Sequence, residues 1–239
     1  MMRTILLFSA LAVAMLDLPA QVPGSVARII TTMPQKDGIT MGEYENTGSK
    51  PITAIVIEKP VTGLDGMTTT MVSADFPGQP LGHNGRGMLQ VWNDTPVTEM
   101  YVAAVIFEDG TTMGYSRPNP EAPDVVTAIF LRRKGEAEAL ARWHNFVKSL
   151  AGKDDKTAIA EFIKAANAIP AVHDFIGNDT NEARGQNDAL MDIQNQARNA
   201  EIFLSKGERD ARWVREQMLT KYISWRAKEG EKYAKRIPQ

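Results

Sequence analysis

The sequence predicts an α+β protein in which an antiparallel β-sandwich is followed by a bundle of about four helices. Residues 26–116 contain short apolar runs bounded by turn residues, a pattern typical of strands. Residues 121–239 instead carry apolar side chains at three- and four-residue intervals, as amphipathic helices do. Pro118, Pro120 and Pro123 separate the two patterns, because proline interrupts both sheets and helices.

The first twenty residues have the layout of a signal peptide. Arg3 is followed by an apolar run of 12 residues at 5–16 and by small residues before Gln21. A membrane-spanning helix needs about 20 apolar residues, so this run is short for a span. We therefore expect residues 1–20 to be a cleaved signal peptide and the mature chain to be periplasmic or extracellular. An uncleaved anchor and a buried core helix are the alternatives.

Seven short runs in the first region are predicted strands. Asn-Gly and Asp-Gly pairs lie between several of them and accept the positive φ of tight hairpin turns. Residues 52–57 and 101–107 are apolar on both faces, which indicates central strands. The predicted strands are 27–32, 39–45, 52–58, 68–73, 88–92, 99–108 and 112–115. This number and spacing favour a two-sheet sandwich.

Two segments resemble known exported modules. Residues 42–52, Gly-Glu-Tyr-Glu-Asn-Thr-Gly-Ser-Lys-Pro-Ile, are similar to the first hairpin of small Ig-like modules in bacterial exported proteins. Residues 104–111 resemble the closing hairpin of uncharacterised exported proteins that have a helical C-terminal region. The resemblance implies an Ig-like β-sandwich at 26–116 and an α-helical region at 121–239. It implies no catalytic residues, because such modules share none.

Four helices are predicted in the second region from their caps and stops. Asp124 caps a helix that runs to Leu150, although Arg133 and Lys134 interrupt its apolar stripe. A second helix begins at Asp154 or Asp155 and stops at Pro170. The third spans 181–204. The fourth spans 208–236, and its predicted apolar face carries Val214, Met218, Tyr222 and Trp225.

Composition excludes several kinds of chemistry. The chain has no cysteine, so it forms no disulfide and has no thiol nucleophile, cysteine zinc site or iron–sulfur cluster. Its net charge is -2, and neither region is strongly basic, which argues against a nucleic-acid partner. No signature of a serine hydrolase or zinc protease occurs. We expect no catalytic residues, no metal and no cofactor.

The remaining candidates for binding are few. His83, Asn84 and Arg86 lie in a glycine-rich loop, but a strand follows it rather than the helix that a phosphate site needs. His173 and Asp174 are adjacent, which allows an oriented imidazole. Basic residues also gather late in the chain, where an amphipathic helix is able to contact a membrane or partner: Arg226, Lys228, Lys232, Lys235 and Arg236.

These observations favour an exported non-enzymatic protein that binds or supports an extracytoplasmic protein or envelope component. The binding surface is expected at the 76–87 loop or at the junction near 116–124. An envelope-polymer hydrolase with a site between sandwich and helices is the first alternative, with His83, His173 and Asp174 as its participants. Membrane-surface binding through the basic C-terminal helix is the second.

Overall fold

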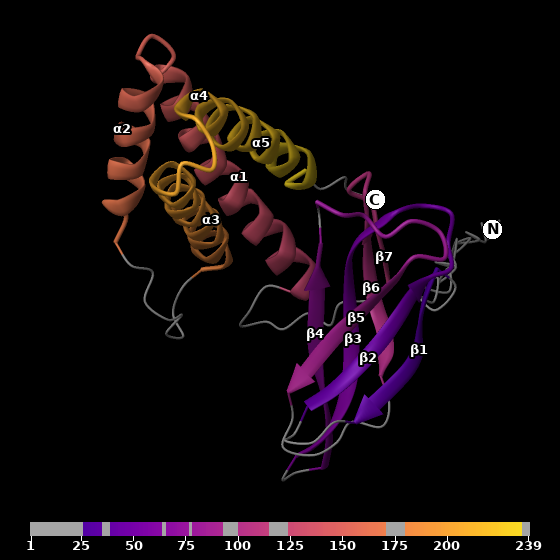
Figure 1. The fold of residues 1–239 in the computed structure, drawn as a ribbon. Coiled ribbons are helices and arrows are strands. Elements are labelled where there is room, and N and C mark those ends of the chain that lie inside the picture. Colours follow the sequence, from indigo (N-terminus) through magenta and orange to yellow (C-terminus); the bar gives the residue numbers. More distant parts are fainter. Residues whose placement is uncertain are drawn as a thin grey trace, which may run out of the picture.

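The computed structural model describes residues 26–34, 39–63, 66–76, 78–92, 100–114, 124–170 and 180–235. Strands occupy the first part of the chain and helices the second, as predicted (Figure 1). The predicted signal peptide and the proline-rich connector lie outside the described residues. Within the described ranges, no helix is long and apolar enough to cross a membrane.

The strands form two antiparallel sheets that pack together. One has the order β1 (Ala27–Pro34), β2 (Ile39–Asn46), β5 (Arg86–Trp92). The other has the order β4 (Gly66–Asp75), β3 (Ile52–Gly63), β6 (Tyr101–Phe107), β7 (Thr112–Gly114). Ile55, Ile57, Val91 and Val105 are buried between the sheets. The two segments predicted as central strands, β3 and β6, are neighbours inside the larger sheet, which explains their apolar character.

The connection between β2 and β3 is not the hairpin that the resemblance implied. The two strands belong to different sheets, so residues 47–51 cross from one to the other. Buried Asn46 directs this crossing, because its side-chain amide donates to the carbonyl oxygens of Lys50 and Leu81 at 2.9 and 2.7 Å. The segment at 104–111 does close a hairpin, between β6 and β7.

The helical region consists of α1 (Val125–Ser149), α2 (Asp155–Asn167), α3 (Asn181–Ser205) and a last helix in three parts. These parts are α4 (Ala211–Trp213), η2 (Val214–Lys221) and α5 (Tyr222–Tyr233). The predicted caps of the first two helices are confirmed, since Asp124 accepts from Thr127 N and Asp154 from Thr157 N. A core that includes Phe162, Ile193, Val214 and Ile223 holds the helices together.

The predicted apolar face of the last helix holds for Val214, Met218 and Tyr222, which belong to or pack against the helical core, and is wrong for Trp225. The segment η2 is a π-helix, whose wider turn bonds residue i to i+5 and so shifts the phase of the residues after it. Leu219 and Ile223 are therefore buried, while Trp225 is 48% exposed. Tyr222 is half-buried and its ring contacts that of Trp225.

Helices α1 and α3 cross at two glycines. A Cβ atom on Gly135 would collide with the backbone of Glu182, and one on Gly185 would collide with the backbone of Arg132. Each helix thus needs a glycine where the other passes. This close approach brings Arg132 near Asp188, with their ion pair at 2.6 Å, and places the polar side chains of α1 beside those of α3.

Candidate functional site

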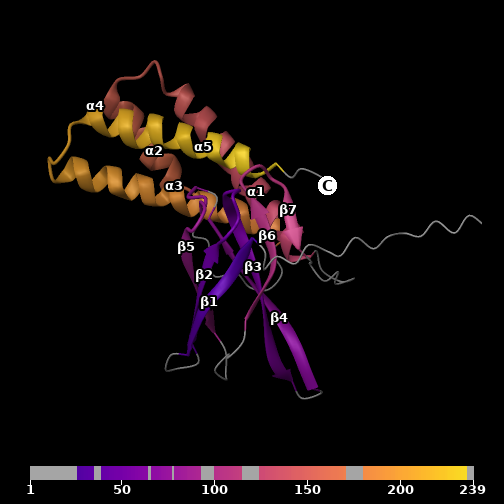
Figure 2. The same ribbon diagram turned by 90° about the vertical axis from the view of Figure 1, so that its right-hand side faces the viewer.

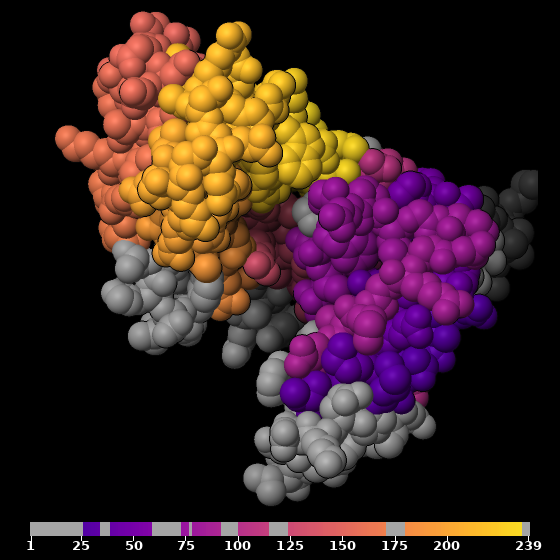
Figure 3. All heavy atoms as spheres, in the orientation of Figure 1, coloured from indigo at the N-terminus to yellow at the C-terminus, as the bar shows by residue number. Residues whose placement is uncertain are grey.

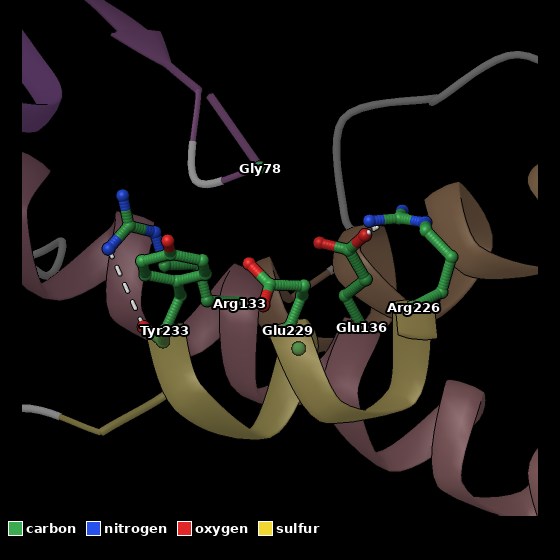
Figure 4. A pocket seen from close by; sticks show the side chains of 7 residues that line it. Gly78, Arg133, Glu136, Arg226, Glu229 and Tyr233 are labelled. Carbon is green, nitrogen blue, oxygen red and sulfur yellow. Dashed lines mark hydrogen bonds and ion pairs between the residues drawn. The ribbon is translucent and has the colours of Figure 1, made fainter. Parts of the chain in front are cut away.

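A buried arginine joins the sandwich to the helices. Arg133, on α1, is 3% exposed, and its Nη2 atom lies 2.6 Å from Oδ1 of Asp75 at the end of β4. Nη2 also donates to the carbonyl and hydroxyl oxygens of Thr53, both at 3.1 Å. Nη1 donates to the carbonyl oxygen of Tyr233 on α5 (Figure 4). Asp75, at the end of edge strand β4, therefore pairs its carboxylate with a buried guanidinium.

A second network links three helices beside this arginine. Arg226, on α5, donates to Glu136 of α1 at 2.6 Å and to Asp192 of α3 at 3.0 Å. The Tyr222 hydroxyl donates to the same aspartate at 2.8 Å. Burial raises the pKa of Glu136, and nearby Asp75 and Asp188 add to this, whereas Arg226 opposes it. The Glu136 carboxyl therefore holds a proton more readily than an exposed glutamate.

A cavity of about 420 Å³ lies where the two networks meet. This volume falls in the range of about 300–1,000 Å³ that is typical of ligand sites. The sandwich contributes Ser73, Asp75 and Gly78 to its lining, and the helices contribute Ile129, Arg132, Glu136, Asp188 and Arg226. Figure 3 shows from outside the boundary at which the orange and yellow helices meet the purple strands.

A crevice of about 10 Å³ adjoins this cavity and has room for about one water molecule. The crevice and the cavity share the lining residues Gly78, Glu136 and Arg226. The crevice is also lined by Arg133, Glu229, Gly230 and Tyr233. We call the cavity and crevice together the junction site. The chemistry of the site is polar, because it brings carboxylates and guanidiniums together with one aliphatic side chain, Ile129.

Glu229 differs from the other carboxylates of the junction site. Its side chain is half-buried and makes no ion pair or hydrogen bond with any described residue. In Figure 4 the carboxylates of Glu229 and Glu136 both point toward the segment that contains Gly78. In the described part of the chain, no group of three or more histidine or acidic side chains is placed to hold a metal ion.

The predicted binding loop stabilises the sandwich. Nδ1 of His83 lies 3.0 Å from the carbonyl oxygen of Gly48. Asn84 adopts a positive φ of 59°, and its amide donates to the carbonyl of Asn46. Arg86 lies 3.5 Å from Glu45. None of the three lines the junction site, although Gly78 from the predicted 76–87 surface does. His173 and Asp174 lie outside the described residues.

The basic residues late in the chain do not gather on one free face. Arg226 is taken up by Glu136 and Asp192, Lys232 by Glu108 at 2.6 Å, and Lys235 by Glu231 at 3.1 Å. Lys228 lines a groove between α1 and α5. Arg236 lies outside the described residues. Three of the four described cations are therefore paired with carboxylates, and Lys228 is not.

Comparison with known proteins gives no match. No protein-family model fits the chain, and no curated protein or solved structure is significantly similar to it.

Proposed function

We propose that this is an exported, non-enzymatic binding protein whose junction site holds a polar envelope component that carries an amino group. The observation that supports it is the 420 Å³ cavity lined by side chains of both regions. A site shared in this way needs the sandwich and helices in one arrangement, which the buried Arg133 maintains through Asp75, Thr53 and Tyr233. The signal-peptide pattern at 1–20 supports export.

The strand order supports an Ig-like sandwich as part of this proposal. In constant-type Ig domains the first, second, fourth and fifth strands form one sheet, and the third, sixth and seventh form the other. Here the same division holds except for β4, which pairs with β3 instead of β5. The change leaves the end of β4, with Asp75, facing the helices.

The preference for an amine follows from the charges. Four carboxylates and three guanidiniums line the junction site: Asp75, Glu136, Asp188 and Glu229 against Arg132, Arg133 and Arg226. Asp75, Glu136 and Asp188 are each ion-paired to an arginine, which leaves Glu229 as the free acceptor among the described residues of the lining. A ligand ammonium group donates a charge-assisted hydrogen bond to the carboxylate of Glu229.

Calorimetric titration of the mature protein tests the proposal. The probes are soluble peptidoglycan fragments with free amines and the same fragments after N-acetylation. We expect the free amines to bind at least tenfold more tightly, a difference of about 1.4 kcal/mol. Glu229→Gln should remove this preference, whereas Glu201→Gln, an exposed change on α3, should retain it. Equal affinity for both forms, or no binding, contradicts the proposed ligand class.

Location is tested separately by the intact mass of the protein in a fractionated bacterial host. Loss of about twenty residues and a product outside the cytoplasm are expected if the signal peptide is cleaved. A full-length cytoplasmic product contradicts export. It leaves the ligand titration valid, because that experiment uses purified protein.

An envelope-polymer hydrolase is the second candidate, and the raised pKa of Glu136 favours it. A general acid needs a carboxyl that stays protonated near neutral pH, with a second carboxylate such as Glu229 close by. The ion pair to Arg226 opposes this role, because it stabilises the ionised form of Glu136. Mass spectrometry of incubated fragments decides: hydrolysis lost in Glu136→Gln means an enzyme, and unchanged fragments mean a binding protein.

A further inference from the structure

The helical region has a second hollow surface that shares no lining residue with the junction site. Two cavities of about 350 and 380 Å³ lie along α1 and the last helix, and His144 and Ser224 line both. We call the two together the His144 groove. Figures 1 and 2 show α1 and α5 side by side. Ala158 of α2 also lines the first cavity.

The first cavity is mostly apolar. Val147 of α1, Leu150 directly after α1, Ala158 of α2 and Leu219 of η2 line it, and all four are buried residues. Because three helices enclose it, this cavity is a hollow between elements rather than a flat helix face. It therefore suits an apolar body of limited length.

The π-helical segment and Arg215 define this cavity. Leu219 and Thr220 belong to η2, and π-helical turns are frequent at functional sites. Arg215 lines one part of the cavity and donates to the carbonyl oxygens of Leu150, Ala151 and Lys153 and to Asp155, at 2.7 to 3.0 Å. This guanidinium is satisfied by the protein and holds the α1–α2 turn, so it offers little to a ligand.

Two lysines stand near His144. Lys148 lines the first cavity and Lys228 the second. Neither side chain makes an ion pair or hydrogen bond within the described ranges. Burial and these two lysines lower the pKa of His144. The hydroxyl of Ser224 lies 3.2 Å from Nδ1, which leaves Nε2 for a ligand.

We propose that the His144 groove binds a medium-chain carboxylic acid. The carboxylate lies beside His144, where the two cavities share their lining, with Lys148 on the first-cavity side and Lys228 on the second-cavity side. The chain fills the 350 Å³ cavity over Val147, Ala158 and Leu219. The chain does not extend further into the second cavity, because Glu138 and Glu231 line it. Apolar burial contributes about 0.8 kcal/mol for each CH₂ group, so the chain supplies most of the affinity and the lysines supply selectivity for the acid.

Three probes separate the contribution of the apolar chain from that of the carboxylate charge in calorimetric titrations of the mature protein. Decanoate carries both chain and charge, 1-decanol carries the chain alone, and acetate carries the charge alone. We expect decanoate to bind at least tenfold more tightly than either of the others. Decanol that binds as tightly as decanoate, or decanoate that does not bind at all, overturns the proposal.

Variants assign the binding to this groove. The double variant Lys148→Gln/Lys228→Gln should lose at least tenfold of its decanoate affinity and keep its weak affinity for decanol. Ala151→Phe, at an exposed position of the lining, should weaken both by filling the cavity. Lys164→Gln, an exposed change on α2, is the matched control. An unchanged decanoate affinity in the double variant overturns the proposal. The proposal is also overturned if the protein binds an acidic helical peptide and does not bind decanoate.

Discussion

Arg133 and Asp75 form an ion pair between α1 and the end of β4, with Nη2 2.6 Å from Oδ1. The two residues are 58 positions apart in the chain, and the guanidinium is almost completely buried. The same guanidinium uses the carbonyls of Thr53 and Tyr233, so one side chain contacts β3, β4 and the end of α5. Arg133 is therefore the buried polar contact between the two regions, and the Lys232–Glu108 ion pair is a second, more exposed one.

Asp75→Asn should destabilise the protein strongly. It removes the charge that compensates a buried guanidinium, and breaking such a pair costs about 3–5 kcal/mol. The neighbouring change Arg132→Met removes a more exposed pair, so it should cost less than about 1 kcal/mol. Urea unfolding measures both. Similar losses in the two variants would contradict the central role of Arg133.

Replacing both partners should be less harmful than replacing one. In Arg133→Met combined with Asp75→Asn no buried charge remains, and such replacements are often close to neutral. We expect the double variant to recover at least half of the unfolding free energy that Asp75→Asn loses. A double variant that is less stable than the single one would show that the hydrogen bonds of Arg133, rather than its charge, dominate.

Gly185→Ala should separate α1 from α3. The added methyl group meets backbone atoms of Arg132. Backbone atoms cannot rotate away as the end of a side chain can, so the helices must shift. Overpacking of this kind costs about 1–3 kcal/mol or more. Gly152→Ala is the control, since nothing lies near its added methyl group. Thermal unfolding should show a clearly lower Tm only for Gly185→Ala.

Tyr222 should make stability fall at alkaline pH. Burial and then the hydrogen bond to Asp192 raise the pKa of its hydroxyl to about 12. In the unfolded chain a tyrosine has a pKa of about 10. The folded state therefore keeps a proton that the unfolded state loses, and the unfolding free energy decreases as pH rises from about 10 to about 12.

Tyr222→Phe provides the comparison for this pH dependence. It keeps the ring and removes the titrating hydroxyl, so its unfolding free energy should fall less over the same range. Tyr44 and Tyr233 also have raised pKa values and remain in both proteins, which makes the difference between the two curves specific to Tyr222. Parallel curves would contradict the assignment.

Local patterns in the sequence predict much of the fold. Asp124 and Asp154 are recognisable as caps because a cap depends on the next three residues, and both are confirmed. The connection at 47–51 is different. Its turn residues predict a reversal of the chain, but only pairing with distant strands decides whether β3 joins β2 or β6. Trp225 is misplaced because a π-helical turn has no recognisable sequence signal here.

The junction site could not be predicted from the sequence, although one sign of it was visible. Arg133 stands out as an interruption of an apolar stripe, which by itself is typical of a solvated edge. Its burial depends on acceptors 58, 80 and 100 positions away. No sequence pattern marks Glu229. Its carboxylate lacks an ion-pair partner among the described residues because the arginines of the junction site pair with the other carboxylates there.

The hydrogen bond from Arg133 to the carbonyl oxygen of Tyr233 also has a consequence for biosynthesis. A ribosome makes this residue a hundred positions after Arg133, so the arginine's set of acceptors is complete only after residue 233 has been synthesised. Until then the guanidinium has Asp75 and Thr53 but no carbonyl from the last helix. The polar contacts of Arg133 are thus completed late, whereas Val126, Ile129 and Phe130 of α1 pack against the sandwich without the last helix.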